Sequence, residues 1–228
     1  MTTETLSPYT MNTERTQKTD PGTRFWDKTA RKYAKSKIAD KAGYRRSLAR
    51  TADYLLAEDE VLEIGCGTGA TALQHAPRVK HITGTDISGE MVAIATEKVL
   101  EDGRLNAEFV VSGAQSLPFA DQSFDAAMAH NLYHLVDDVD AALAAAHRVL
   151  KPNGVFITKT PCLGEMNPLM RNIVLPVMRR FYGVPTLHTF TIEAFKQAIL
   201  DAGFKIEAVE FHGTKGKDNR PFIVARAK

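Results

Sequence analysis

The sequence predicts an α/β fold in which helices cover both faces of a mostly parallel sheet. An apolar strand at 61–64 ends in a glycine-rich loop at 65–69 and leads directly into a helix. Strand patterns and amphipathic helix patterns then alternate along most of the 228 residues. Such alternation is typical of βαβ units, whose helices pack on both sides of a parallel sheet and give three layers.

Two helices are expected before the first strand. Residues 1–22 are rich in Thr, Ser and charge and offer little to bury, so we expect a disordered tail there. From residue 24 to about 37, aromatic residues recur at helical spacing, and 44–56 carries leucines along one face. We expect these leading helices, within 24–56, to cover the sheet.

The remaining elements follow the glycine loop in order. Thr68 is placed to cap the helix that begins at Ala70, and Ser88 to cap the next one. Further helices are expected at 88–100, 138–150 and 192–202. The expected strands are 81–86, 106–112, 123–130, 155–160, and two near 204–211 and 222–225.

Residues 161–190 form an insertion in this alternation. Between residues 166 and 182, apolar side chains recur at i, i+3, i+4 and i+7, with arginines on the other side. Pro176 would kink such a helix because it removes one backbone hydrogen bond. Two interpretations stay open, namely a lid over a binding pocket and an ordinary core helix.

The composition is that of an ordinary globular protein, with 44% hydrophobic and 25% charged residues. A net charge of +2 is too small to indicate a nucleic-acid partner by itself. Cys66 and Cys162 have neither the spacing of a zinc site nor the number expected of a disulfide framework, so no metal is expected. The polar start lacks the apolar core of a signal peptide, which fits a cytoplasmic protein.

The glycine loop predicts a site for an adenosine-containing ligand. Glycines permit positive φ angles and a close approach of the ligand, and N–H groups at the start of a helix attract an anionic group. Asp86 ends the next strand and is suited to accept two hydrogen bonds from a ribose diol. The spacing Gly65-x-Gly67-x-x-Ala70 also satisfies the dinucleotide fingerprint, so the loop alone leaves the cofactor open.

Five landmarks in register resemble the class I S-adenosylmethionine-dependent methyltransferases, in particular the methyltransferase domain 11 and quinone-methyltransferase groups. They are Glu63-x-Gly65-x-Gly67-x-Gly69, Asp86-Ile87-Ser88-x-x-Met91, and residues 114–119, 121–125 and 148–154. The resemblance covers about residues 24–211 and implies one methyltransferase domain over 23–228. It also implies a Rossmann-like sandwich with seven strands, the last antiparallel, and S-adenosyl-L-methionine as cofactor with S-adenosyl-L-homocysteine as product.

The resemblance assigns roles to the residues around the loop. Glu63 is implied to accept from the cofactor's ammonium group, Asp86 to hold the ribose, and Asn131 to contact the methionine end. Gly113 departs from the pattern, because many relatives carry there an acidic residue that accepts from the adenine amine. The expected cofactor residues are Tyr33, Glu63, Gly65, Cys66, Gly67, Gly69, Asp86, Ile87, Met91, Gly113, Ala114, Gln115 and Asn131.

Tyr133 and His134 are the candidates for orienting or deprotonating the acceptor, because relatives place residues facing the methyl group after the fourth strand. A base is needed only when the acceptor must lose a proton. The apolar insertion favours a small hydrophobic or amphiphilic acceptor, and its arginines would suit an anionic group or peripheral contact with a membrane surface. No nucleic-acid module is recognisable, so a nucleic-acid partner is not expected.

Two hypotheses from other classes stay open. A nicotinamide-dependent oxidoreductase would use the same loop and Asp86, but it would not explain the landmarks at 114–119 and 148–154. A non-catalytic methyltransferase-like binding protein would treat Gly113 as a sign of decay. Binding of S-adenosylhomocysteine, of NAD, or of neither separates the three hypotheses.

Overall fold

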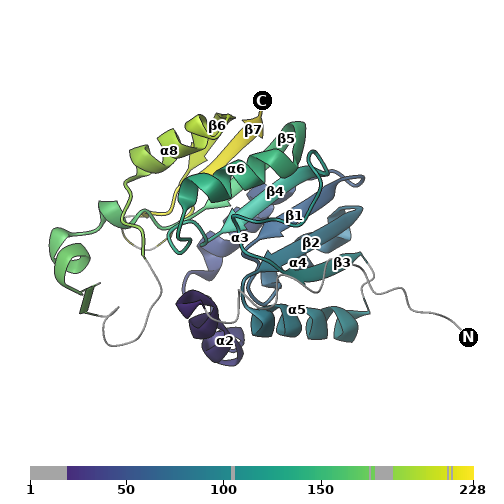
Figure 1. Cartoon of the computed structure of the whole chain (residues 1–228), viewed down its shortest axis with the longest axis horizontal. Helices are drawn as coiled ribbons and strands as arrows, with labels where there is room; N and C mark the ends of the chain where they lie inside the picture. Colours follow the sequence, from purple (N-terminus) through teal and green to yellow (C-terminus); the bar gives the residue numbers. More distant parts are fainter. Residues whose placement is uncertain (1–19, 104–105, 175, 178–186, 215, 217) are drawn as a thin grey trace, which may run out of the picture.

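The fold is built on one seven-stranded sheet with the strand order β3-β2-β1-β4-β5-β7-β6 (Figure 1). The computed structural model describes residues 20–103, 106–174, 176–177, 187–214, 216 and 218–228. The strands are β1 (Glu60–Ile64), β2 (His81–Asp86), β3 (Ala107–Val111), β4 (Phe124–His130), β5 (Leu150–Lys159), β6 (Phe204–Glu210) and β7 (Phe222–Ala227).

The pairing of the strands confirms the predicted topology. Strands β1 to β5 pair in parallel, whereas β7 pairs antiparallel with both β5 and β6. Strand β1 lies between β2 and β4, so the chain leaves β1 in one direction across the sheet and later returns on the other side. In such sheets the ligand crevice lies at the carboxyl ends of the strands where the order reverses. Here that point is the end of β1 and β4.

The helices cover both faces, as predicted. Helices α6 (Val139–Val149) and α8 (Ile192–Asp201) pack on one face, where Leu143 and Phe195 meet Phe156 in one apolar cluster. Helices α4 (Ala70–His75) and α5 (Gly89–Asp102) and the residues after α3 (Lys41–Ala52) pack on the other face. The strands β1, β4, β5 and β7 therefore supply alternate residues to two cores, as the periodicity of strands requires.

The start of α4 differs from the prediction. Gly69, at φ 72°, occupies the N-cap position, and no side chain caps the helix. A Cβ at residue 69 would lie 2.7 Å from the Phe109 ring, so the close packing against β3 requires glycine here. Thr68 is buried, and its carbonyl oxygen accepts from Lys98 Nζ at 2.7 Å. Ser88 does cap α5, since its side chain accepts from Met91 N at 3.2 Å.

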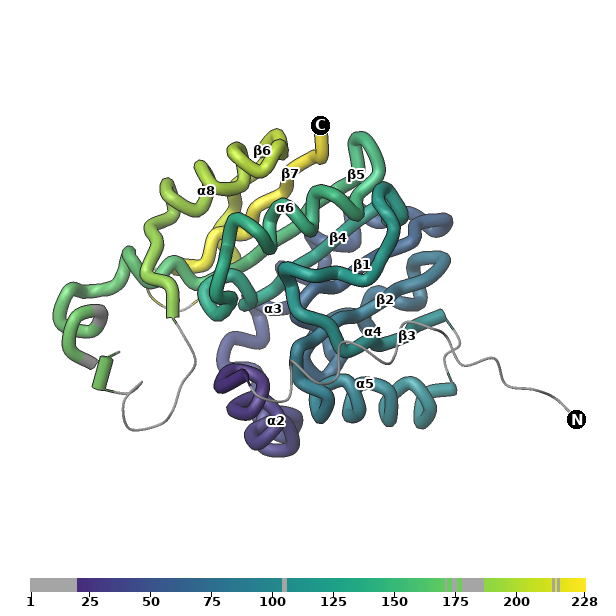
Figure 2. Tube along the Cα trace, in the orientation of Figure 1, coloured from purple at the N-terminus to yellow at the C-terminus, as the bar shows by residue number. Residues whose placement is uncertain are grey.

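The helix α2 (Pro21–Ala34) begins earlier than expected, with Asp20 as its N-cap, so residues 20–22 are not part of a tail. The rest of the expected tail lies outside the described residues. Helix α2 lies beside α5, as Figure 2 shows, with Arg31 bound to Glu97 at 2.9 Å and Ala30 packed against Met91. This packing holds α2 above the carboxyl ends of the strands.

The described part of the insertion is helical at residues 168–174 and 176–177, within the helix that the sequence predicts over 166–182, but a π-helical turn interrupts the regular α-helix. It contains a 3₁₀ turn at Leu163–Glu165 and a π-helical turn at Met170–Val174, and it projects away from the sheet (Figure 1). Residues 175 and 178–186 of the predicted helix lie outside the described residues. Leu169 and Ile173 are 60% and 56% exposed, so these apolar side chains are not part of the core.

Candidate active site

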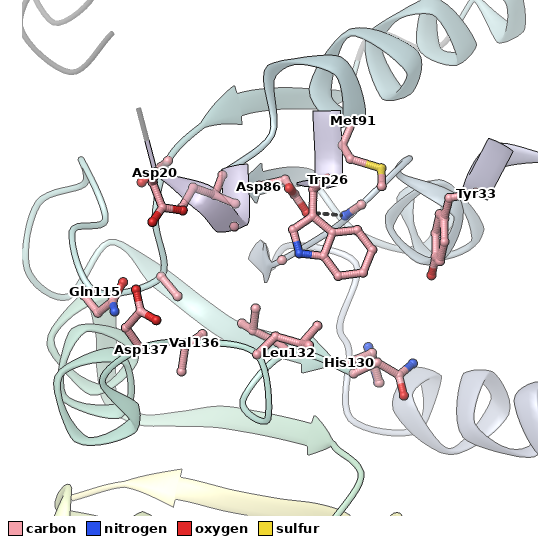
Figure 3. A pocket seen from close by; sticks show the side chains of 18 of the residues that line it. Asp20, Trp26, Tyr33, Asp86, Met91, Gln115, His130, Leu132, Val136 and Asp137 are labelled. Atoms are coloured by element: carbon pink, nitrogen blue, oxygen red, sulfur yellow. Dashed lines mark hydrogen bonds between the residues drawn. The ribbon is translucent and has the colours of Figure 1, made fainter. Parts of the chain in front are cut away.

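A cavity of about 370 Å³ lies between α2 and the carboxyl ends of β1, β2 and β4 (Figure 3). The strand ends supply its floor and α2 supplies its roof. In Figure 3, Asp20, Gln115 and Asp137 lie at one end, Trp26 lies across the middle, and Tyr33 and His130 lie at the other end. The cavity is therefore elongated, with polar groups at both ends and apolar side chains between them.

The glycine loop forms part of the floor. Gly65 and Gly67 have φ angles of 69° and 53°, in the left-handed region that favours glycine. A Cβ on Gly65 would lie 2.7 Å from Leu132, whereas one on Gly67 would meet only the Tyr33 ring at 3.8 Å. Gly67 is thus the point at which a ligand can approach the backbone most closely.

The loop's N–H groups were expected to attract an anionic part of the ligand, but three of them are bonded within the protein. The N–H of Cys66 donates to Thr85 O at 2.8 Å, and the N–H of Gly69 donates to Cys66 O at 3.0 Å. The N–H of Gly67 donates to Asp86 Oδ2 at 2.9 Å. These hydrogen bonds fix the shape of the loop, and they leave those three donors unavailable to a ligand carboxylate.

Asp86 is the charged group at the centre of the cavity. Its two carboxylate oxygens accept from Gly67 N and Ser88 N, each at 2.9 Å, and each oxygen keeps a second lone pair. Burial, together with the neighbouring carboxylates of Glu63 and Asp27, raises the pKa of Asp86 to about 6. A ligand that donates hydrogen bonds to this carboxylate would favour its ionised form.

Glu63 lies behind the cavity wall rather than in it. Its side chain is buried, and its Oε1 is 3.9 Å from Nδ1 of His130, which does line the cavity. Neither Glu63 Oε2 nor His130 Nδ1 has a hydrogen-bond partner within the described residues. Burial raises the pKa of Glu63. Of this pair, the structure thus places His130 on the cavity side and Glu63 behind it.

Helix α2 contributes two aromatic side chains to the cavity. Trp26 and Tyr33 meet edge to face, with ring centroids 6.2 Å apart. In Figure 3 the indole lies between the Asp86 side and the Leu132 side of the cavity, and Tyr33 lies opposite His130. Tyr33 was among the expected cofactor residues, whereas Trp26 was not.

The opposite end of the cavity contains the stretch around Gly113. Ser112, Ala114 and Gln115 line the cavity, whereas Gly113 does not. The Ser112 hydroxyl is within hydrogen-bonding distance of the carbonyl oxygens of Gly113 and Ser116. A Cβ on Gly113 would make only ordinary contacts, the nearest being Ser116 Oγ at 3.6 Å. A side chain at this position therefore has room.

Comparison with known proteins decides the family. Residues 62–158 match the family described as a methyltransferase domain, and this range contains both the glycine loop and Asp86. Over these residues the chain matches that family, and the relatives and solved structures described below support a class I S-adenosylmethionine-dependent methyltransferase.

Two curated relatives match this methyltransferase at 36% identity. An uncharacterized methyltransferase of Bacillus subtilis, YcgJ, aligns over 132 residues, which are 58% of this chain and 52% of the relative. The ubiquinone/menaquinone biosynthesis C-methyltransferase UbiE of Brucella abortus aligns over 125 residues, 53% of this chain and 43% of the relative. The methyltransferase thus matches about half the length of these curated relatives.

Solved structures agree with the fold. The crystal structure of YcgJ superimposes with a TM-score of 0.63 and 28% identity, covering 73% of this chain and 72% of that one. An S-adenosylmethionine-dependent methyltransferase from Methanosarcina mazei gives a TM-score of 0.63 and 27% identity, covering 78% and 96%. Both similarities extend over more than 70% of this chain.

The residues of the cavity fit the family's cofactor. Asp86 is a buried carboxylate with spare lone pairs, and the buried His130 Nδ1 has no partner within the described residues. A side chain on Gly67 would reach across the cavity toward Tyr33. The expected cofactor residues that line the cavity are Tyr33, Gly65, Gly67, Asp86, Ile87, Met91, Ala114, Gln115 and Asn131. Glu63, Cys66, Gly69 and Gly113 support it from outside.

The expectation that Tyr133 orients or deprotonates the acceptor is wrong, because the structure places this residue in the core of the fold. Its side chain is fully buried and packs against Phe156 and Phe195, with ring centroids 6.1 and 5.4 Å away. Burial also raises the pKa of its hydroxyl. Tyr133 therefore cannot contact an acceptor or remove its proton.

His134 lines neither of the two cavities that we describe. Its Nδ1 lies 3.3 Å from Thr160 Oγ1, and burial, together with His188, lowers its pKa to about 4. A base is most effective when its pKa is near the working pH, so His134 is poorly suited to this role. The expectation of a base at His134 is not supported by its position.

The sequence missed several residues of the cavity, although some carried a signal. Asp20 has helix-cap chemistry, and His130 ends a predicted strand, which is where functional groups of such sheets gather. Asp137 and the apolar residues before it follow β4 in a stretch without a recognisable pattern. The missed lining residues are Asp20, Pro21, Gly22, Trp26, Ser112, His130, Leu132, Leu135, Val136 and Asp137.

Among the described residues, no group of three or more His, Cys, Asp or Glu side chains could hold a metal ion. The same part of the chain contains no helix that combines the length and apolarity needed to cross a bilayer.

Proposed function

We propose that this methyltransferase moves a methyl group from S-adenosylmethionine to a small hydrophobic or amphiphilic acceptor. The observation that carries the proposal is the cavity in which Asp86, the glycine loop and the two aromatic residues of α2 meet. S-adenosylmethionine supplies an activated methyl group on a sulfonium, a good leaving group. The protein's task is then to align the acceptor and to exclude water.

In this proposal Asp86 holds the ribose and the polar end around Gln115 receives the adenine. Ile87 and Met91 supply apolar contacts beside Asp86. His130 and Asn131 contact the methionine end, and Tyr33 lies opposite His130. The roof formed by Trp26 and Tyr33 shields the reacting groups from water, which strengthens the electrostatic interactions below it.

The acceptor class is supported by the insertion. Its described apolar side chains Leu169, Met170, Ile173 and Val177 are exposed, and exposed apolar groups are suited to contact an apolar part of a ligand. The name of UbiE refers to C-methylation in quinone biosynthesis, which makes aromatic rings reasonable first candidates. We further propose a cytoplasmic site of action without a nucleic-acid partner, since the chain's charges nearly balance.

The test is an acceptor screen that records S-adenosylhomocysteine formation. The purified protein is incubated with S-adenosylmethionine and a panel of small phenols, quinols, aromatic acids and thiols. The proposal predicts acceptor-dependent formation of the product, which Asp86→Ala reduces strongly. Product formation only with nucleic acid or protein acceptors would contradict the proposed acceptor class.

A further inference from the structure

A second cavity of about 150 Å³ lies next to the cofactor cavity. It is bounded by α3, the ends of β4 and β5, and the start of β7. His130 and Asn131 line both cavities, so they form the boundary between them. The N–H of Asn131 donates to Lys159 O at 2.7 Å, which ties this boundary to the end of β5.

The second cavity contains a buried cation without a counter-ion bonded to it. Lys159 is 9% exposed, and its Nζ donates to Ser47 Oγ at 3.0 Å. The Lys159 ammonium group has three protons to donate, but within the described residues it makes this one hydrogen bond. Among the same residues, no carboxylate lies within ion-pair distance of Lys159 Nζ. A buried charge is normally paired, because an unpaired one is costly to remove from water.

Arg220 adds a second cation to the same wall. Its Nε donates to Asp218 Oδ1 at 3.2 Å, whereas its two terminal nitrogens have no partner within the described residues. The exposed fraction of its side chain is 39%, so it forms the outer edge of the cavity. Lys159 and Arg220 together offer the cavity more hydrogen-bond donors than the protein satisfies.

Two carboxylates near these cations are already occupied. Asp40 lines the cavity, but its oxygens accept from Gly43 N, Thr214 N and the Thr214 hydroxyl. Asp218 accepts from the backbone N–H of Gly213 and from Arg220. The unused capacity of the site is therefore on the donor side. Because the two carboxylates formally balance the two cations, the site offers unused donors rather than a net positive charge, and a ligand with a single negative charge fits better than a dianion.

The size and the remaining walls restrict the ligand further. A cavity of roughly 150 Å³ is known to hold a single benzene ring. Ile38 and Leu48 supply apolar surface, and the hydroxyls of Tyr44 and Thr71, 3.3 Å apart, supply polar surface. One ring or a short chain bearing one acidic group matches this mixture.

We propose that the second cavity binds the carboxylate of the methyl acceptor against Lys159 and Arg220, so that the substrate is a small organic acid. This inference rests on the proposed function. The carboxylate anchors the acceptor, and the atom to be methylated lies toward His130 and Asn131. No covalent step involves Lys159, which acts as a binding residue.

The experiment titrates benzoate into the protein saturated with S-adenosylhomocysteine and repeats the titration without it, using calorimetry or ligand-observed NMR. Benzamide serves as the neutral isostere and phenyl phosphate as the dianion. The variants are Lys159→Met and, independently, Arg220→Gln. The control is Lys80→Met, which removes an exposed lysine paired with Glu60 at 2.9 Å and away from both cavities.

We expect benzoate to bind at least tenfold more tightly than benzamide and phenyl phosphate, and Lys159→Met to weaken it at least tenfold. Lys80→Met should bind benzoate like the wild type, and Lys159→Met should keep the wild-type affinity for S-adenosylhomocysteine. Replacing a buried charge by an apolar side chain of similar length is often neutral for folding, so Lys159→Met should fold. If Lys159→Met does not fold, the benzoate affinity of Arg220→Gln is the measurement that tests the site.

Equal binding of benzoate and benzamide, or unchanged benzoate binding in the variants, would overturn the acid site. Preference for phenyl phosphate would overturn the choice of a carboxylate. Absence of S-adenosylhomocysteine binding with intact, Lys159-dependent benzoate binding would overturn the proposed function and leave the anion site standing.

Discussion

The cofactor cavity and the smaller cavity beside it are assembled in different ways. The first takes its central polar groups from the ends of neighbouring strands and from the glycine loop, which are close in sequence. The second joins Ser47 and Lys159, which are 112 residues apart, with Arg220 near the chain's end. The residues of the cofactor cavity can therefore be recognised from short sequence motifs. The residues of the second cavity come together only when distant parts of the chain fold against one another.

The largest expected effect lies in the cofactor cavity. Asp86→Ala should weaken S-adenosylhomocysteine binding at least tenfold, and about 100-fold if two charge-assisted hydrogen bonds to the ribose are lost. Calorimetry provides the measurement, and benzoate binding by the second cavity is the internal control. Unchanged S-adenosylhomocysteine affinity would remove Asp86 from the site.

The raised pKa of Asp86 gives this prediction a pH dependence. Below a pKa of about 6 the carboxyl group of the free protein is protonated, so it can no longer accept two charge-assisted hydrogen bonds from the ribose diol. S-adenosylhomocysteine affinity should therefore fall as the pH decreases, by about tenfold at roughly pH 5. In the free protein the same shift favours the folded state as the pH falls from 6 towards 4, because the folded state then binds more protons than the unfolded one. Asp86→Asn should abolish both dependences.

A smaller effect is expected from the insertion, on the acceptor side. Replacing Leu169 and Ile173 together by Ser should lower kcat/KM about tenfold for the acceptor found in the screen, through lost apolar contact. Because both side chains are more than half exposed, the free energy of unfolding should change little. S-adenosylhomocysteine affinity is the control, and a simultaneous loss of it would contradict the separation of the two regions.

A gain of affinity is expected at Gly113. Gly113→Asp restores the carboxylate that many relatives carry and, since a Cβ there meets nothing closer than 3.6 Å, it should fold normally. S-adenosylhomocysteine should bind about fivefold more tightly, by about 1 kcal/mol for one added hydrogen bond to the adenine amine. Gly113→Asn is the matched variant without charge. Weaker binding in both would mean that the adenine lies elsewhere.

The smallest effect is expected at Tyr133. Its buried hydroxyl has no hydrogen-bond partner among the described residues, so Tyr133→Phe should raise the free energy of unfolding by up to about 1 kcal/mol. Activity should change less than about twofold, because the ring lies in the core. Denaturant unfolding and steady-state kinetics are the two measurements. A large loss of activity would restore Tyr133 as a candidate for catalysis.

The sequence predicted the sheet and most of the cofactor cavity because both depend on local patterns. Strand and helix periodicity placed every strand within a few residues of its observed position, apart from the earlier start of β5. Glycine spacing and the strand end at Asp86 located the cavity floor. These signals survive folding because neighbouring parallel strands bring their ends together.

The errors arose where long-range packing decides the outcome. Thr68 has capping chemistry, but the packing of Gly69 against Phe109 sets the start of α4. Tyr133 follows the right strand, yet its ring turns into the core. Lys159 gave no signal at all, since a lysine at the end of a predicted strand is normally solvated. Its burial depends on α3, which lies far away in the sequence.

The central claim is that the cavity around Asp86 binds S-adenosylmethionine. Calorimetric titration of the purified protein with S-adenosylhomocysteine, near neutral pH and with NAD as the control ligand, tests it most directly. The account predicts a dissociation constant in the micromolar range, about −8 kcal/mol, for S-adenosylhomocysteine and no binding of NAD. Binding of NAD alone would make the protein an oxidoreductase, and binding of neither ligand would make it a non-catalytic relative.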